Sequence, residues 1–315
     1  MAELRRALIV AGPTASGKSA LALAVAERLG GTVINADAMQ VYRELRIVTA
    51  RPTTAEEARV PHRLYGVRPA AEPGSVAWWR AAALAEMAAA RRPILCGGSG
   101  LYLAALTGGI APIPDPGAPA RAEARRRLAE DGPAALHAAL AAVDPATAAR
   151  LRPSDSQRLA RAWEVWAGTG RGLASWQTER AAPPPWEFAA ILLDPPRPAL
   201  REAIARRFAA MLADGAEAEV AALLAQALDP ALPAMRAHGV PELAAHLRGE
   251  ITRAEAARRA ELVTGQYTKR QATWFRHHQL ADPARMHTIH ARMTGLEQFS
   301  ESEMAGLMNF LRWLG

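Results

Sequence analysis

The segment from Gly12 to Ser19, GPTASGKS, has the residue types and the spacing of a phosphate-binding loop. Its glycines allow the backbone to curl so that successive N–H groups point inward, towards an anion. Lys18 adds a compact positive charge, and the Ser19 hydroxyl can hold Mg²⁺. A diphosphate- or triphosphate-binding site with Ser19 as the metal ligand is therefore predicted at Gly12, Pro13, Thr14, Ala15, Ser16, Gly17, Lys18 and Ser19.

The elements beside this loop are those that the motif requires. An apolar run at residues 7–10 predicts a strand, and Leu21, Val25 and Leu29 predict one face of a helix that begins at the loop. The positive end of such a helix faces the bound anion. The loop alone does not say which phosphate compound it holds or what happens to that compound.

Three more apolar segments predict strands that end in polar residues. Residues 32–35 run to Asp37, residues 93–96 run into Gly97-Gly98-Ser99, and residues 189–193 run to Asp194. Short apolar strands separated by helical patterns are typical of a parallel sheet with helices on both faces. Ligands of such sheets bind at the carboxyl ends of the strands, so the loop, Asp37 and Ser99 are expected to converge on one crevice.

Proline-rich segments at residues 112–118 and 181–186 predict linkers. The chain between them has helical patterns with arginine-rich faces and few strand signals. We therefore predict an α/β P-loop NTPase-like core formed by residues 1–114 and 186–315, with C-terminal helices, and a helical insertion at residues 115–185. In the tail, Ser300 and Glu303 predict a capping box before an apolar stripe that packs in the core.

The composition describes a globular chain of 315 residues with a net charge of +7 and a pI of about 10.4. An excess of arginine suggests a polyanionic partner, although arginines on solvated helix faces would give the same count. Only two of the 38 basic residues are lysines, Lys18 and Lys269. No apolar run is long enough to cross a membrane, and Cys96 has no second cysteine to pair with, so we expect a soluble, cytoplasmic protein without membrane contact.

Further motifs resemble those of one family, the tRNA dimethylallyltransferases or isopentenyltransferases. The resemblance covers about residues 7–280, and the most selective segments are N-A-D-A-M-Q-V-Y from Asn35 and K-R-Q-A-T-W-F-R from Lys269. Others are T-A-R-P from Thr49, P-H-R-L from Pro61, G-G-S-G-L-Y from Gly97, Q-R-L-A-R from Gln157, G-T-G-R from Gly168 and R-F from Arg207.

The resemblance implies transfer of a dimethylallyl group from dimethylallyl diphosphate to N6 of the adenosine 3′ of the tRNA anticodon, with release of diphosphate. Asp37 would accept a hydrogen bond from the adenine amino group and act as general base. Ser99 would help to place the substrates and Arg207 would bind the diphosphate. The implied partners are the tRNA anticodon arm, dimethylallyl diphosphate and Mg²⁺, and we expect a monomer.

Residues for tRNA contact come from the family pattern and from the basic face of the helix predicted near residues 253–278. The alternative is that these basic residues only face solvent, as most charged side chains do. The predicted contacts are Asp37, Ala38, Met39, Gln40, Ser99, Arg121, Gln157, Arg158, Leu159, Ala160, Arg161, Lys269, Arg270 and Arg276.

The chain departs from the usual family pattern, and two rival functions, an ATP-dependent kinase and a non-catalytic RNA-binding ATPase, share its loop. The departures are Ala38, Val48, Gly66, Val240, Pro241 and Gly265. The stronger rival is the ATP-dependent kinase of a small molecule or nucleotide, because residues 191–194 imitate a strand that ends in a metal-binding aspartate. A kinase leaves the K-R-Q-A-T-W segment unexplained.

Overall fold

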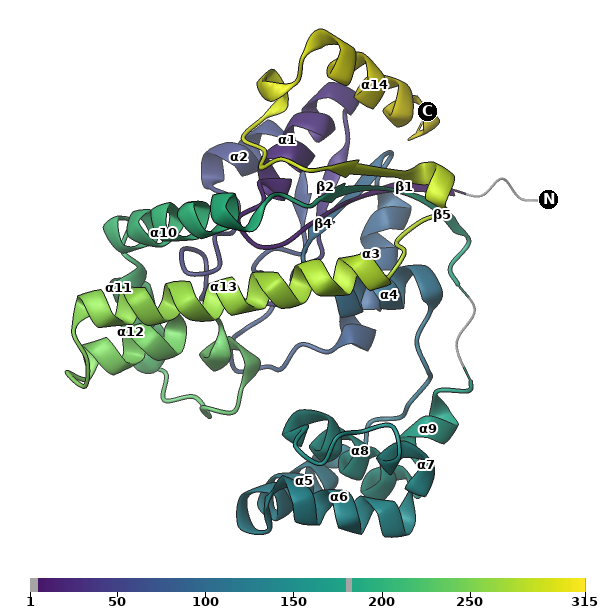
Figure 1. Ribbon diagram of the computed structural model, residues 1–315, viewed down its shortest axis with the longest axis vertical. Coiled ribbons are helices and arrows are strands. Elements are labelled where there is room, and N and C mark those ends of the chain that lie inside the picture. The colour runs from purple at the N-terminus through teal and green to yellow at the C-terminus, as the bar shows by residue number, and fades with distance from the viewer. Residues whose placement is uncertain (1–4, 180–182, 315) are drawn as a thin grey trace. The chain divides into compact units, whose positions relative to one another are not determined.

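The chain forms two compact units in a computed structural model that describes residues 5–179 and 183–314 (Figure 1). One unit comprises Met1–Thr107 and Pro184–Gly315, and the other comprises Gly108–Pro183. The larger unit contains the phosphate loop, Asp37, Ser99 and Arg207. Most of the predicted site therefore belongs to one folded body.

A six-stranded parallel sheet is the centre of the larger unit, with the strand order β3-β2-β4-β1-β5-β6. Strand β1 lies inside the sheet and pairs with β4 on one side and with β5 on the other. The strands are β1 (Arg5–Ala11), β2 (Thr32–Asn35), β3 (His62–Arg63), β4 (Pro93–Gly97), β5 (Trp186–Leu193) and β6 (Met286–Ile289).

Each face of the sheet has its own apolar core because side chains alternate along a strand. In β1, Leu8 and Val10 pack with α1 (Lys18–Leu29) and with α14 (Glu301–Leu311). Ala7 and Ile9 belong to the core of the opposite face. The helices that contribute to that second core are α3 (Val76–Ala89), α4 (Gly100–Gly108), α10 (Arg197–Ala213), α11 (Ala216–Leu224), α12 (Val240–Leu247) and α13 (Arg253–His277). Figure 1 shows the sheet between these two layers.

The smaller unit has helices and no strand among its described residues. Its core contains Leu136, Leu140, Leu159 and Trp163, all nearly or fully buried. The helices are α5 (Gly117–Glu130), α6 (Gly132–Val143), α7 (Pro145–Ala148), α8 (Ser156–Thr169) and α9 (Leu173–Trp176).

The predicted α/β class, with a parallel sheet, helices on both faces and a phosphate loop after β1, is confirmed. All four predicted strands are present. The sequence pattern missed β3, which has only two residues, and β6, whose residues are half polar. The short α2 (Thr54–Arg59) and α12 were also missed.

In the tail, the capping box of Ser300 and Glu303 is present, and Leu307 and Leu311 are buried in the core as expected. Within residues 5–179 and 183–314, every helix is too short or too polar to cross a bilayer.

Candidate active site

The phosphate loop is held in an open curl between β1 and α1. Gly17, the residue before α1, has φ of +90°, a left-handed conformation that glycine adopts without strain. A Cβ atom at Gly17 would lie 1.8 Å from the backbone oxygen of Met293, so the position also needs the missing side chain for space. The ring of N–H groups at the N-terminus of α1 is therefore fixed by local conformation and by packing against the C-terminal segment.

Lys18 lies almost completely buried at the start of α1, with 8% of its surface exposed. Its Nζ donates to the carbonyl oxygen of Pro13 at 3.4 Å, which folds the side chain back along the loop. Burial lowers the pKa of Lys18, whereas the negative charge of Asp37 opposes that shift. The ammonium group and the Asp37 carboxylate thus influence each other in one site.

Asp37 is fixed by the residues that follow β2. Its Oδ1 accepts a hydrogen bond from the N–H of Met39 at 2.9 Å, and its own N–H donates to Oδ1 of Asn35 at 2.8 Å. Asn35 is held in turn, because Nε1 of Trp79 donates to its carbonyl oxygen at 2.8 Å. Among the described residues, Asp37 Oδ2 has no hydrogen-bond partner, so one carboxylate oxygen is left for a ligand.

Ser99 connects the ends of β2 and β4. Its Oγ accepts from the N–H of Ala38 at 2.9 Å and shares a hydrogen bond with the hydroxyl of Tyr267 in α13. Burial raises the pKa of Tyr267, and the negative charge of Asp37 raises it further, so the phenol stays neutral. His238 packs edge-on against the Tyr267 ring, with centroids 4.8 Å apart. The sequence did not predict Tyr267 or His238, because neither residue lies within one of the motifs.

Gln271 is a third residue whose role the sequence did not show, although it lies inside the K-R-Q segment. Its Oε1 accepts from the N–H of Thr14 at 2.9 Å, and its Nε2 donates to the carbonyl oxygen of Gly98 at 2.9 Å. The side chain is 4% exposed. Gln271 therefore ties α13 to the phosphate loop and to the end of β4 together.

Arg207 extends from α10 and is held at the site by the turn at Thr49 and Ala50. Nη2 of Arg207 donates to the Thr49 carbonyl oxygen at 3.0 Å. Nε2 of Gln40 donates to the carbonyl oxygens of Thr49 and Ala50, at 2.9 and 2.8 Å. Burial lowers the pKa of Arg207 and Asp37 opposes this shift. Gln40, predicted to contact tRNA, thus has a structural role as well.

Two cavities meet at Arg207, which lines both of them. The Asp37 cavity has a volume of about 210 Å³, and its walls are formed by Asp37, Ser99, Tyr267 and His238 together with the apolar residues Val48, Ile204, Phe208 and Met211. The Lys18 cavity has a volume of about 330 Å³ and is lined by four cationic residues, Lys18, Arg51, Arg207 and Arg292, with Ser19 and Tyr65 beside them.

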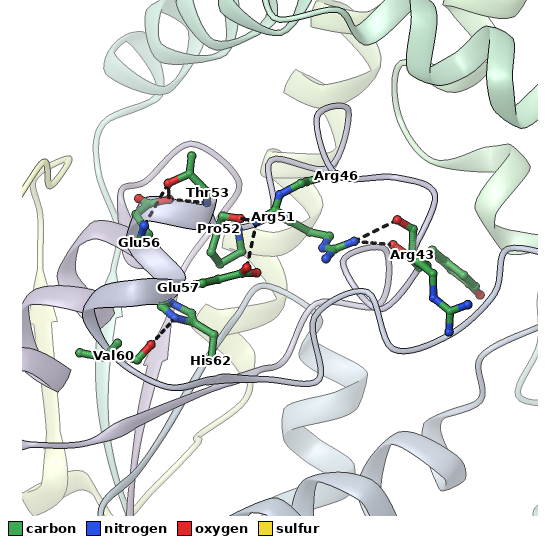
Figure 2. A network of polar contacts seen from close by, with 10 residues as sticks. Arg43, Arg46, Arg51, Pro52, Thr53, Glu56, Glu57, Val60 and His62 are labelled. Carbon is green, nitrogen blue, oxygen red and sulfur yellow. Dashed lines mark hydrogen bonds and ion pairs between the residues drawn. The ribbon is translucent and has the colours of Figure 1, made fainter.

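The rim of the Lys18 cavity is a network of polar contacts between residues 42 and 62, which Figure 2 shows. Nη1 of Arg51 donates to the carbonyl oxygen of Arg43 at 3.1 Å, and Nη2 of Arg46 donates to Oε2 of Glu57 at 3.0 Å. Thr53 and Glu56 form the capping box at the start of α2. These contacts hold the rim in one conformation beside the phosphate loop.

Ser19 offers a hydroxyl group to the Lys18 cavity from the exposed side of α1. It also shares a hydrogen bond with the thiol of Cys96, whose pKa burial raises to about 11. Cys96 is 2% exposed, as expected for a small apolar residue at a strand end. In the described part of the chain, His, Cys, Asp and Glu side chains form no group of three or more that could hold a metal ion.

Asp194, the aspartate on which the kinase alternative depends, lies at the end of β5 but lines neither cavity. It borders a groove with Arg197, Lys269 and Arg276, and its Oδ2 is 3.9 Å from Nδ1 of His290. The aspartate that lines the first of these cavities is Asp37.

The residues predicted for tRNA contact fall into three places. Asp37, Ala38, Met39, Gln40 and Ser99 surround the Asp37 cavity or its approach. Lys269, Arg270 and Arg276 are exposed on α13, where the Arg270 guanidinium lies 5.6 Å from the centre of the Tyr267 ring.

The third group lies in the helical unit. Arg121, Arg158 and Arg161 form ion pairs with Asp115, Asp155 and Glu164 on that unit's surface. Gln157 is exposed and Ala160 is half-buried. Leu159 is fully buried in the core, so it can support a contact surface only by holding α8 in place.

Comparison with known proteins gives one consistent family. The family model for IPP transferase matches residues 40–278. The tRNA dimethylallyltransferase of Acidiphilium cryptum is 67% identical over 308 residues, which cover 98% of this chain and 95% of that protein. The corresponding protein of Granulibacter bethesdensis is 64% identical over 313 residues, 98% of each chain.

A solved structure agrees with these sequences. The full-length tRNA isopentenylpyrophosphate transferase from Bacillus halodurans matches with a TM-score of 0.67 and 28% identity. The match covers 99% of this chain and 97% of that one.

Proposed function

This chain belongs to the IPP transferase family, and on that basis we propose that it is a tRNA dimethylallyltransferase. The reaction moves a dimethylallyl group from dimethylallyl diphosphate to N6 of the adenosine 3′-adjacent to the anticodon, at position 37 of tRNA, and releases diphosphate. The observation that supports it best is the pair of cavities joined at Arg207, because one presents a carboxylate and the other presents cations.

The Lys18 cavity suits the diphosphate of the donor. The C1–O bond of an allylic diphosphate breaks more readily when the negative charge that builds up on the leaving oxygen is stabilised. Lys18, Arg207 and the N–H groups of the phosphate loop are positioned before the reaction to do this in a largely buried site. Arg207 lines both cavities, so it lies where the breaking bond would be.

The proposal includes Mg²⁺, for which Ser19 is the protein ligand. An exposed hydroxyl beside Lys18 fits an ion that is bound mainly by substrate phosphates and water and takes few ligands from the protein. When bound, Mg²⁺ supplies further positive charge next to the diphosphate.

The Asp37 cavity suits the acceptor base and the prenyl chain. The adenine amino group is a weak nucleophile because its lone pair is delocalised into the ring. Asp37 Oδ2 can accept a hydrogen bond from N6–H and take the proton as the new C–N bond forms. Val48, Phe208 and Met211 provide the apolar wall for the dimethylallyl group.

The adenosine reaches this cavity only if it leaves its stack. Extruding a base costs a few kcal/mol and is least costly in a single-stranded loop such as the anticodon loop. We propose that Lys269, Arg270 and Arg276 on α13 contact tRNA phosphates, and that the helical unit contributes Arg121, Gln157, Arg158 and Arg161. The proposal also includes a cytoplasmic monomer, since tRNA is the substrate and one chain supplies every residue named.

Incubation of the protein with tRNA, Mg²⁺ and labelled dimethylallyl diphosphate tests the proposal. We expect the label to appear on a modified adenosine in nuclease digests of the tRNA, and an equal amount of diphosphate to be released. A parallel reaction with ATP labelled at the γ-phosphate should show no transfer. ATP consumption without prenylated RNA would support the kinase alternative, which the position of Asp194 outside both cavities disfavours.

A further inference from the structure

The C-terminal segment after β6 lies directly against the phosphate loop. β6 pairs in parallel with β5, so the residues after it leave the sheet at the same edge as the loop. The N–H of Met293 donates to the carbonyl oxygen of Ser16 at 2.9 Å. Met293 is 2% exposed, and its backbone occupies the space that a side chain at Gly17 would need. The segment is thus part of the wall of the diphosphate site.

Arg292 is the residue that this segment brings to the Lys18 cavity. Its Nε donates to the carbonyl oxygen of Ala15, inside the phosphate loop, at 3.1 Å. The residue is half-buried and lines the cavity together with Lys18, Ser19 and Arg207. Within the described residues, neither Nη atom of Arg292 has a hydrogen-bond or ion-pair partner. One edge of the guanidinium is therefore fixed on the loop, and its other N–H groups remain available for an anion.

The charge in this cavity is unbalanced. Lys18, Arg51, Arg207 and Arg292 face a single lining carboxylate, Glu56. That carboxylate is already engaged, because its Oε2 accepts from both the N–H and the Oγ1 of Thr53. A diphosphate carries multiple negative charges, and guanidinium groups bind its oxygens with two hydrogen bonds in a fixed geometry.

We propose that Arg292 is a further diphosphate-binding residue, which the C-terminal segment presents to the leaving group through its Nη atoms. The inference rests on the proposed function for the identity of the anion. It assigns a role to a segment outside the matched family region at residues 40–278. It also assigns two separate tasks to the segment: Met293 holds the loop through its backbone, and Arg292 binds the ligand through its side chain.

Calorimetric titration of the full chain with inorganic pyrophosphate and Mg²⁺, without tRNA, tests the inference directly. We expect Arg292→Ala to weaken pyrophosphate binding about tenfold to hundredfold, the usual effect of losing charge-assisted hydrogen bonds. Arg292→Lys keeps a charge but loses the paired geometry, so its loss should be smaller. In steady-state assays, Arg292→Ala should raise the KM for dimethylallyl diphosphate and leave the KM for tRNA unchanged.

Arg285→Ala is the matched control. Arg285 lies just before β6, where its Nη1 pairs with Glu187 at 3.2 Å, and it lines neither cavity. Pyrophosphate affinity equal to that of the unmodified chain in Arg292→Ala would overturn the inference. So would a loss accompanied by a lower unfolding temperature and an equal rise in both KM values, because that pattern indicates a structural role only.

The titration separates this inference from the proposed function. If the chain binds pyrophosphate through Arg292 but no prenyl group reaches tRNA, the inference stands and the proposed reaction fails. If prenyl transfer occurs normally in Arg292→Ala with unchanged pyrophosphate affinity, the reaction stands and the inference fails.

Discussion

The two cavities that meet at Arg207 differ in what their walls offer. The Asp37 cavity has one carboxylate and the guanidinium groups of Arg207 and Arg236 among apolar and aromatic side chains, whereas the Lys18 cavity has four cations and one engaged carboxylate. The difference matches the two halves of a prenyl transfer, in which a diphosphate departs on one side and a proton leaves nitrogen on the other. The hydrogen bond from the N–H of Met39 fixes Asp37 at the wall of its own cavity, where its negative charge still acts on Lys18 and Arg207.

The largest effect should follow from removing the base of the Asp37 cavity. Asp37→Asn keeps an oxygen for the N–H of Met39, so the turn should survive, but the group can no longer take a proton. We expect single-turnover prenyl transfer to fall about 10²- to 10⁴-fold, the usual contribution of a general base, with little change in tRNA or pyrophosphate affinity.

Asp194→Asn is the matched control for Asp37→Asn, because Asp194 also follows a strand of the same sheet, β5. Near-normal transfer by Asp37→Asn would remove the base assignment, and loss of transfer by Asp194→Asn would contradict the division into two cavities.

The only two lysines of the chain allow pyrophosphate binding and tRNA binding to be tested separately. Lys18→Ala should weaken pyrophosphate binding about tenfold to hundredfold and leave tRNA affinity unchanged, because Lys18 is buried in the Lys18 cavity. Lys269→Ala, at an exposed position of α13, should weaken tRNA binding and reduce its salt dependence without affecting pyrophosphate. Calorimetry measures the affinity for pyrophosphate, and filter binding measures the affinity for tRNA. Equal effects of the two variants on either affinity would contradict the separate roles of Lys18 and Lys269.

The pH dependence of pyrophosphate binding reports on the same lysine. Burial lowers the pKa of Lys18, so its charge is lost at a lower pH than the ordinary value of 10.5 for lysine. The contribution of Lys18 to pyrophosphate affinity should therefore be lost as the pH rises, at a pH below 10.5, and by no more than Lys18→Ala removes. Lys18→Arg keeps its charge throughout this range and serves as the reference, because it corrects for the titration of pyrophosphate itself. If pyrophosphate affinity changed with pH in the same way in the unmodified chain and in Lys18→Arg, the prediction would be refuted.

The smallest effect is expected at the apolar wall of the Asp37 cavity. Val48 is 5% exposed and lines this wall, so Val48→Ala removes two carbons from the surface proposed to contact the prenyl group. At about 0.8 kcal/mol per buried carbon, losing contact with one or both carbons should raise the KM for dimethylallyl diphosphate about four- to fifteenfold, and discrimination against a longer prenyl donor should decrease. Val67→Ala, at a position that is 45% exposed, is the control and should change neither value.

Much of this site could be predicted from local sequence. The phosphate loop is a continuous motif, and Asp37 and Ser99 each lie two residues after the end of an apolar strand. Because the strands are parallel, their carboxyl ends place these residues at the same end of the sheet. The resemblance to the tRNA dimethylallyltransferases was carried by similar continuous segments, and the family model confirms it. The roles assigned to individual residues, and contact of the helical unit with tRNA, stay predictions.

Other parts of the site depend on contacts between distant segments. Gln271 reaches the N–H of Thr14 across 257 positions, and Arg292 reaches the Ala15 carbonyl across 277. Neither contact leaves a periodic or compositional signal near the residue itself. The same reason explains why β6 was missed, since a four-residue strand at a sheet edge is stabilised by its partner β5 more than by its own composition.

The sequence by itself determined the fold class, the phosphate loop and the family, because each depends on residues that are neighbours along the chain. Only the tertiary structure decided that Tyr267, Gln271 and Arg292 complete the site and that Asp194 lies outside its cavities. The physical reason is that the direction of a side chain at a helix or strand end is set by what packs against it, and those partners come from other parts of the chain.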